Sequence, residues 1–378
     1  MTSLLSSNNK DNLLSNLLGA RSAPASSPRS QPLAFPFFDQ FHPTSTSTSA
    51  FKPHNVTVLC GGPFSGKSRL LSHICALTVI PAGGLAVVLD LDHRFVDVAR
   101  DTIALHCAAT AAAAKQTQGD DADDRSSSSD EQVVAAGVLV LRPTRETGAS
   151  GLLTCLTRLA TAELFEDLVA AVDSSSLLSE SSAWTDKRHI SGHVLAGSVA
   201  FDLLAYGDER TACARSTLDS PVLAVFVDGL ASLYWHLSDP SSSSAQVSSS
   251  SLTWAQVASR TMSALQRVSR VYGSIPALAC VTILSPATTT PRQSIHVADK
   301  AWPMVPGADA YIYLQRIPLR QWRYDAPQSH NAAGANDDDD ADDETTSLVS
   351  VQVSSVNAST VKEFKMALSQ VHGVRFRE

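Results

Sequence analysis

Short apolar runs alternate with amphipathic segments along the chain from residue 55 onward. Five runs have the length of buried strands: 56–60, 85–91, 137–141, 222–227 and 277–283. Between them, apolar side chains recur at helical spacing over 70–79, 152–169 and 254–272, each of which is predicted to be one helix. Strands that alternate with helices form right-handed βαβ units and a mostly parallel sheet with helices on both faces. The pattern therefore predicts an α/β fold.

Local signals mark the ends of the last helix and the C-terminal part of the sheet. Thr253 and Gln256 have the spacing of a capping box, and Gly273 follows the last apolar position of the helix. Near the C-terminus, apolar side chains alternate over 348–353 and recur in 364–368 and 374–376. These short segments predict antiparallel strands at one edge of the sheet.

Low-complexity segments divide the chain into four regions. Residues 1–54 contain a short leucine-rich helix and a flexible Ser-, Pro- and Thr-rich linker, and 55–327 form the core. The core has disordered insertions near 108–132 and 238–251, and its segment 174–216 shows no clear pattern. Residues 328–346 form an acidic insertion, and 347–378 complete the core with strands.

Charge and composition narrow the class of protein. The net charge of −8 comes from acidic runs in 120–131 and 337–344, so the rest of the chain is about +4, which permits a nucleic-acid partner without requiring one. No apolar run has the length of a membrane span, and residues 1–10 are polar, so we expect neither a membrane nor a secretory protein. The six cysteines contain no C-x-x-C pair, which predicts buried thiols in a reducing compartment.

The strongest chemical signal is the segment Gly61-Gly62-Pro63-Phe64-Ser65-Gly66-Lys67-Ser68, which fits G-x-x-x-x-G-K-[ST] between a predicted strand and a predicted helix. Backbone N–H groups and the helix N-terminus of such a loop bind phosphates, Lys67 reaches the β and γ phosphates, and Ser68 holds magnesium. The loop predicts ATP and Mg²⁺ as cofactors. Phe64 occupies a position that is often glycine, where the backbone can need positive φ, so we expect looser nucleotide binding.

Carboxylates stand at the ends of two other predicted strands. Asp228 ends the run 222–227, where it would hold the magnesium ion beside the phosphate loop. Asp90 and Asp92 end the run 85–91 in the same manner. Asp92 is the candidate catalytic base that would orient an attacking water, although its side chain is one methylene shorter than glutamate.

With these strand ends in place, the chain resembles the RecA-type recombinase superfamily, and within it the eukaryotic recombinase paralogues of homologous recombination. In the segment 88–95, Asp92 stands where the recombinases have a catalytic glutamate. The segment 226–235 is similar to the second acidic motif, including its Tyr-Trp ending. The helix at 13–21 and two C-terminal landmarks at 300–302 and 347–350 also match. The order and spacing of these segments are specific, whereas each segment alone is not.

The resemblance implies a RecA-like P-loop NTPase core with a mostly parallel twisted sheet. It implies an ATP-binding accessory protein of homologous recombination and double-strand break repair in the nucleus. Such a protein acts in a complex with other recombinase paralogues, with the N-terminal helix as one contact, and assists recombinase assembly on single-stranded or branched DNA. The family's DNA-facing loops correspond to 236–252 and 285–300. Arg292, His296 and Lys300 in the second loop allow phosphate contact, although an ordinary solvated loop explains them equally well.

Hydrolysis is less certain than binding, and two alternatives stay open. Active recombinases carry a polar sensor at the end of the strand that reads 279–284 here, and only Thr282 is polar, which predicts weak or absent DNA-dependent ATPase activity. The first alternative is a DNA-stimulated ATPase that acts directly in strand exchange. The second is a P-loop small-molecule kinase, for which Arg316, Arg320 and Arg323 would be the only late arginine cluster.

A metal site outside the phosphate loop has little support. His189 and His193 have the spacing of metal ligands on a helix, but Gly192 lies between them and no third ligand is visible.

Overall fold

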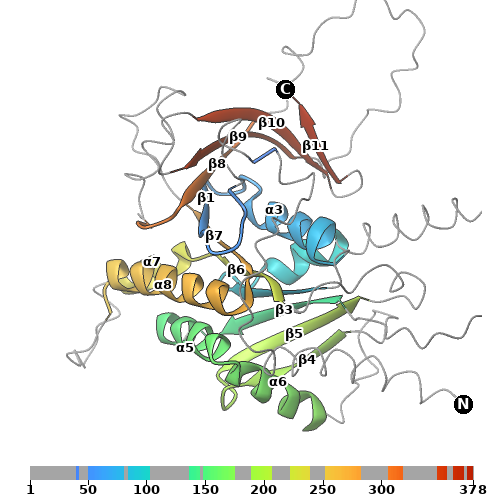
Figure 1. Ribbon diagram of the computed structural model, residues 1–378, viewed down its shortest axis with the longest axis vertical. Helices are drawn as coiled ribbons and strands as arrows, with labels where there is room; N and C mark the ends of the chain where they lie inside the picture. The colour runs from blue at the N-terminus through green and yellow to red at the C-terminus, as the bar shows by residue number, and fades with distance from the viewer. Residues whose placement is uncertain are drawn as a thin grey trace, which may run out of the picture.

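A computed structural model describes residues 40–41, 50–80, 84–102, 136–144, 148–174, 189–206, 222–238, 252–281, 305–317, 347–355, 361–369 and 373–377. These residues form a mixed α/β structure around one eleven-stranded sheet (Figure 1). The strand order is β11-β10-β9-β8-β1-β7-β6-β2-β3-β5-β4. None of the helices in these ranges is long and apolar enough to cross a membrane.

The centre of the sheet is parallel, as the sequence pattern predicts. Its strands in spatial order are β8 (Ala310–Arg316), β1 (Thr57–Gly61), β7 (Ile275–Val281), β6 (Val222–Asp228), β2 (Leu85–Asp90) and β3 (Ala136–Pro143). The side chains of β1 and β2 are buried along their whole length, because helices or other chain segments cover both faces of a parallel sheet. All five predicted apolar strands are present, and the α/β assignment is confirmed.

Antiparallel strands complete both edges. The predicted C-terminal strands are confirmed as β9 (Ser347–Ser355), β10 (Lys362–Ser369) and β11 (Gly373–Arg377), which continue the sheet from β8. At the opposite edge, β4 (His189–Val194) and β5 (Val199–Tyr206) form a hairpin beside β3, within the segment for which no element was predicted. His189 and His193 therefore lie on a strand, and the hypothesis of ligands on one helix is wrong. The described residues contain no cluster of three metal-binding side chains.

Helices flank the sheet. The phosphate loop is followed by α3 (Lys67–Ile74), whose helix continues as a π-helical turn, η1 (Cys75–Val79). The predicted long helix over 152–169 is instead two helices, α5 (Gly148–Ala160) and α6 (Glu163–Ser174). The break comes at Ala162, whose φ of 64° is incompatible with a right-handed helix. Because neither glycine nor proline marks this break, the apolar spacing alone predicted a continuous helix.

The remaining helices are α7 (Ala231–Ser238) and α8 (Trp254–Tyr272). The predicted capping box of α8 is confirmed: Thr253 Oγ1 accepts from the Gln256 backbone N–H at 3.4 Å, and Gln256 Oε1 accepts from the Thr253 N–H at 2.9 Å. Gly273 ends the helix with a φ of 63°. At its C-terminal end, α8 is joined to α5, since the Tyr272 hydroxyl donates to the Leu159 carbonyl at 2.8 Å.

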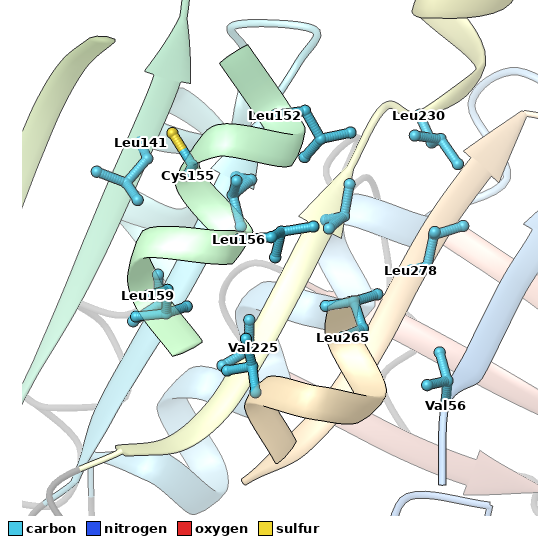
Figure 2. Packing of buried hydrophobic residues seen from close by; sticks show 14 of the residues in the cluster. Val56, Leu141, Leu152, Cys155, Leu156, Leu159, Val225, Leu230, Leu265 and Leu278 are labelled. Carbon is cyan, nitrogen blue, oxygen red and sulfur yellow. The ribbon is translucent and has the colours of Figure 1, made fainter. Parts of the chain in front are cut away.

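Two apolar layers enclose the sheet. One layer packs α5 and α8 against the sheet, with Leu156, Val225 and Leu265 at its centre (Figure 2). The other lies under α3 and includes Leu70 and Leu71. The described cysteines, Cys60, Cys75, Cys155 and Cys280, are buried in these two layers, as predicted.

Aromatic rings connect the segment before β1 with the C-terminal strands. Phe41 is fully buried and makes edge-to-face contacts with Phe51, Phe364 and Phe376, at centroid distances of 5.2, 5.6 and 6.1 Å. The Ala50 N–H also donates to the Phe41 carbonyl at 3.0 Å. This part of the predicted linker is thus packed on the core.

Several predictions concern residues outside the described ranges. They include the helix at 13–21, the insertions at 108–132 and 328–346, residues 239–251, the loop 285–300, and the individual residues Thr282, Arg320 and Arg323.

Candidate functional site

The phosphate-loop segment lies at the carboxyl end of β1 and leads directly into α3. Gly66 begins the helix in a left-handed conformation, with φ 88°, and its carbonyl accepts the first helical hydrogen bond from the Leu70 N–H at 2.8 Å. A Cβ at this position would also lie 2.9 Å from the Cδ1 atom of Leu368 on β10. The positive φ favours glycine here, and a Cβ would in addition displace the Leu368 methyl group.

Phe64 occupies the tip of the loop. Its φ is 58°, as expected for the position that is often glycine, and its side chain is 78% exposed. A left-handed conformation costs a non-glycine residue roughly 1–2 kcal/mol. The loop therefore holds its shape against an unfavourable residue, while the weaker nucleotide binding that we expect from it remains a prediction.

Lys67 lies inside the loop rather than in solvent. Its Nζ donates to the carbonyls of Gly61 and Gly62 at 3.1 and 2.7 Å and contacts Ser65 Oγ at 3.0 Å, so all three ammonium protons have acceptors. Burial lowers the pKa of Lys67 from its ordinary value, and the nearby charge of Asp228 opposes this shift. The cation is thus held at the loop by groups of the loop itself.

Asp228 ends β6 as predicted and is brought next to the phosphate loop. Its carboxylate accepts a hydrogen bond from the Ser68 hydroxyl at the start of α3. Burial raises its pKa to about 7, and the Ser68 hydrogen bond opposes that shift. Ser68 and Asp228 thus present a hydroxyl and a carboxylate oxygen at one place, and Mg²⁺ prefers oxygen ligands of this kind.

Asp90 is the last residue of β2 and Asp92 lies two residues later, and the two carboxylates differ in role. Asp90 is paired in register with Asp228, and its carboxylate accepts hydrogen bonds from the N–H groups of Arg94 and Phe95 at 3.2 and 2.9 Å. These donors begin the helix over 95–102, so Asp90 acts as the cap of that helix. Burial raises the pKa of Asp90, and these two hydrogen bonds oppose the shift.

Asp92, the candidate base, lies on the turn after β2 and faces the turn after β6. The position that a Cβ would take at Gly229 lies 2.6 and 2.8 Å from the two carboxylate oxygens of Asp92. The Ser232 hydroxyl is hydrogen-bonded to the same carboxylate. Partial burial raises the pKa of Asp92, while the charge of Arg94 opposes this effect. The residue itself remains exposed, so water can reach it.

The structure brings together Lys67, Ser68, Asp92 and Asp228 at the carboxyl ends of the parallel strands. In open α/β sheets, ligands bind at the carboxyl ends of the parallel strands. A buried cation, a helix N-terminus and oxygen ligands suit a phosphate ester with its metal ion. The loop residues Gly61 to Ser68 and Asp228 therefore fit ATP and Mg²⁺ in chemistry and in placement.

Sequence reasoning missed three residues of this site. Gly229 and Ser232 contact Asp92, and Leu368 packs on Gly66 from a strand about 300 residues later in the chain. A glycine directly after the strand-end Asp228 was a usable signal for close approach, whereas nothing in the sequence pointed to Ser232 or Leu368.

No known protein family matches the sequence, and no curated protein matches it.

Proposed function

We propose that this chain is an ATP-binding accessory protein of homologous recombination and double-strand break repair, built on a RecA-like P-loop core. The observation that carries the nucleotide part is the hydrogen bond between Ser68 and Asp228, which joins the phosphate loop to a second buried strand end. The recombination part depends on the resemblance of the sequence motifs to those of the eukaryotic recombinase paralogues. Among these paralogues, the motifs are most similar to those of the second X-ray repair cross-complementing paralogue.

The residues of the loop would bind ATP by complementary charge. Backbone N–H groups at the start of α3 face the phosphates, and Lys67 supplies a positive charge that burial keeps from solvent. Ser68 and Asp228 would hold the magnesium ion, which neutralises phosphate charge when bound. Because Lys67 already contacts loop carbonyls, its side chain exchanges those acceptors for phosphate oxygens on binding.

The arrangement of the sheet supports the RecA-like assignment independently of the sequence motifs. Strand β7 lies between β1 and β6, yet the loop after β1 and Asp228 of β6 meet above its end. In this function the chain acts in the nucleus with other recombinase paralogues and assists recombinase assembly on single-stranded or branched DNA. ATP is bound mainly to stabilise that complex, and turnover is slow or absent.

A DNA-stimulated ATPase is the second candidate, and one observation favours it. Asp92 is exposed and is held close to the charge of Lys67, where a carboxylate could orient water. The shorter side chain of aspartate, compared with glutamate, argues for slow chemistry. A small-molecule kinase has less support, because it needs an arginine-rich lid, whereas Arg316 of its proposed cluster lies on strand β8.

The first experiment measures binding of Mg·ATP by calorimetry, and turnover with and without single-stranded DNA. We expect wild type to bind, Lys67→Ala to bind at least about tenfold more weakly, since it removes a buried charge that meets the phosphates, and both to hydrolyse little. Arg260→Ala, which removes an exposed cation of α8, is the control and should bind like wild type.

Binding of recombinase paralogues is tested in parallel by co-purification with ATP present. Loss of the complex in Lys67→Ala would support a structural role of ATP. Equal nucleotide binding by wild type and Lys67→Ala would contradict the proposed site, and DNA-stimulated turnover that Lys67→Ala abolishes would favour the ATPase alternative.

A further inference from the structure

The turn that follows β6 is fixed on the neighbouring strand. The Leu230 N–H donates to the carbonyl of Ala279 on β7 at 3.2 Å, and the Ser232 N–H donates to the Gly229 carbonyl at 2.9 Å. Gly229 itself has a φ of 77°, which favours glycine. Gly229 and Ser232 thus occupy defined positions at the end of the sheet.

The turn that carries Asp92 is also held from both sides. The Leu91 N–H donates to the Asp228 carbonyl at 3.0 Å, and the His93 ring contacts the Pro143 carbonyl through Nε2 at 3.2 Å. His93 has a φ of 58°, so the backbone turns sharply directly after Asp92. These contacts bring the Asp92 side chain onto the turn after β6.

The Asp92 carboxylate fits this turn because position 229 has no side chain. A Cβ there would come within 3 Å of both carboxylate oxygens, a distance that Cβ atoms do not show in proteins, so the carboxylate would have to move. The bare backbone of Gly229 therefore forms one wall of the place that Asp92 occupies.

The Ser232 hydroxyl forms the other contact. Its Oγ lies 2.8 Å from the Gly229 carbonyl and is also hydrogen-bonded to Asp92. A hydroxyl has one proton, so it can donate to only one of these acceptors at a time. A hydrogen bond to a charged carboxylate is roughly twice as strong as one to a neutral carbonyl. The proton of Ser232 thus goes to Asp92 whenever Asp92 is ionised.

We propose that Gly229 and Ser232 are positioning residues for Asp92: the glycine leaves the space for the carboxylate, and the serine hydroxyl fixes its direction beside the phosphate loop. The inference rests on the proposed function, because a fixed Asp92 affects the reaction only if ATP is bound at the loop. It assigns Gly229 and Ser232 to turnover rather than to nucleotide affinity.

A thermal-unfolding cycle of Asp92→Ala, Ser232→Ala and the double variant tests the contact itself, without need of turnover. Two residues that act through one contact are not additive, so the double variant should lose no more in Tm than the worse single variant. Thr161→Ala is the matched control, because the Thr161 hydroxyl donates to the Arg158 carbonyl three residues back at 3.2 Å. It follows α5 near the Tyr272–Leu159 contact, at the amino ends of the strands and away from the carboxyl ends that carry Asp92. Combined with Asp92→Ala, Thr161→Ala should be additive. Additive losses for Ser232→Ala as well would overturn the proposal.

Single-turnover cleavage of Mg·ATP then tests the consequence. We expect Ser232→Ala to lower the rate about fivefold or more at unchanged ATP affinity, and Ser232→Thr, which keeps the hydroxyl, to restore it. Gly229→Ala should lower the rate to that of Asp92→Ala, and the variant that combines Gly229→Ala with Asp92→Ala should be no slower.

Lower ATP affinity with an unchanged rate would overturn the assignment to turnover. Should wild type bind ATP without cleaving it, the assignment to turnover is overturned, and the unfolding cycle still tests the contact between Asp92 and Ser232. Should Lys67→Ala bind ATP normally, the proposed function fails while the contact is still tested.

Discussion

Lys67 and Asp228 carry opposite charges in a place that water hardly reaches. Burial lowers the pKa of Lys67 and raises that of Asp228 to about 7, so it moves both groups toward their neutral forms. A bound phosphate and a magnesium ion would reverse both shifts, because each supplies the charge that the buried group lacks. The ionised forms of Lys67 and Asp228 are thus less stable without the ligands than with them.

This arrangement predicts a pH dependence of stability. The Asp228 carboxyl loses its proton near 3.8 in the unfolded chain and near 7 in the fold. Between these values the folded state binds more protons, so the free energy of unfolding falls as the pH rises from about 4 to about 7, by at most about 1.4 kcal/mol per pH unit, and is level above. Asp228→Asn removes this contribution, and its stability relative to wild type should increase over that range.

Urea unfolding at pH 5, 6, 7 and 8 measures the effect, with Asp97→Asn on the exposed side of helix 95–102 as the control. Parallel profiles for wild type and Asp228→Asn would contradict it. In the same range, the affinity of wild type for Mg·ATP should rise with pH, since the metal displaces the proton of Asp228.

Single residues of the site differ in how far the sequence predicts them. The loop from Gly61 to Ser68 follows a spacing that phosphate chemistry requires, and Asp228 follows a strand whose end could be identified. The site contacts of Gly229 and Ser232 depend on which turn lies next to Asp92 in space. No local pattern encodes that neighbourhood.

The antiparallel strands β9 and β10 support the phosphate loop. Leu368 of β10 and Val349 of β9 both reach the position above Gly66, at 2.9 and 3.6 Å from where a Cβ would be, and both are fully buried. The strands that close one edge of the sheet thus also set the shape of the loop at its centre.

We therefore expect Leu368→Ala to weaken Mg·ATP binding as well as to destabilise the fold by about 2–5 kcal/mol, the usual cost of deleting a buried leucine side chain. Met366→Ala is the matched control, because Met366 is buried on the same face of the same strand but is not in contact with Gly66. Calorimetric titration at a temperature where both variants are folded distinguishes them. Equal ATP affinities of the two variants would show that strands β9 and β10 do not support the loop.

Elements differ in predictability for a physical reason. The parallel strands are buried on both faces and read as continuous apolar runs, so the pattern located five of the six. Strand β8 was not predicted. The hairpin of β4 and β5 turns over 195–197, where Leu195 and Ala196 have positive φ without being glycine and only Gly197 is a typical turn residue, so its signal was weak. The break at Ala162 between α5 and α6 was missed for the same reason.

Across the whole molecule, the Phe41 cluster holds together the two ends of the described chain. Phe41 precedes β1, while its partners Phe364 and Phe376 belong to β10 and β11. Because β10 also supports the phosphate loop, this cluster connects the chain's first described residues to the site through one strand.

Phe41→Ala should lower the free energy of unfolding by about 3–5 kcal/mol, because it opens a cavity among three other rings. Chemical unfolding of the full chain measures the loss, with the exposed Val361→Ala as the control that should change little. A loss below about 1 kcal/mol would mean that the segment before β1 is not part of the folded core.

The position of β1 between β7 and β8 has a consequence for how the protein is made. Thr57 pairs with Ala277 on one side and Ala310 on the other, more than 200 residues later in the chain. At a synthesis rate of about 5–20 residues per second, the strand leaves the ribosome on the order of ten seconds or more before either neighbour exists. The phosphate loop, among the first parts of the fold to be synthesised, is thus among the last to be completed, and chaperones have that interval in which to cover its apolar strand.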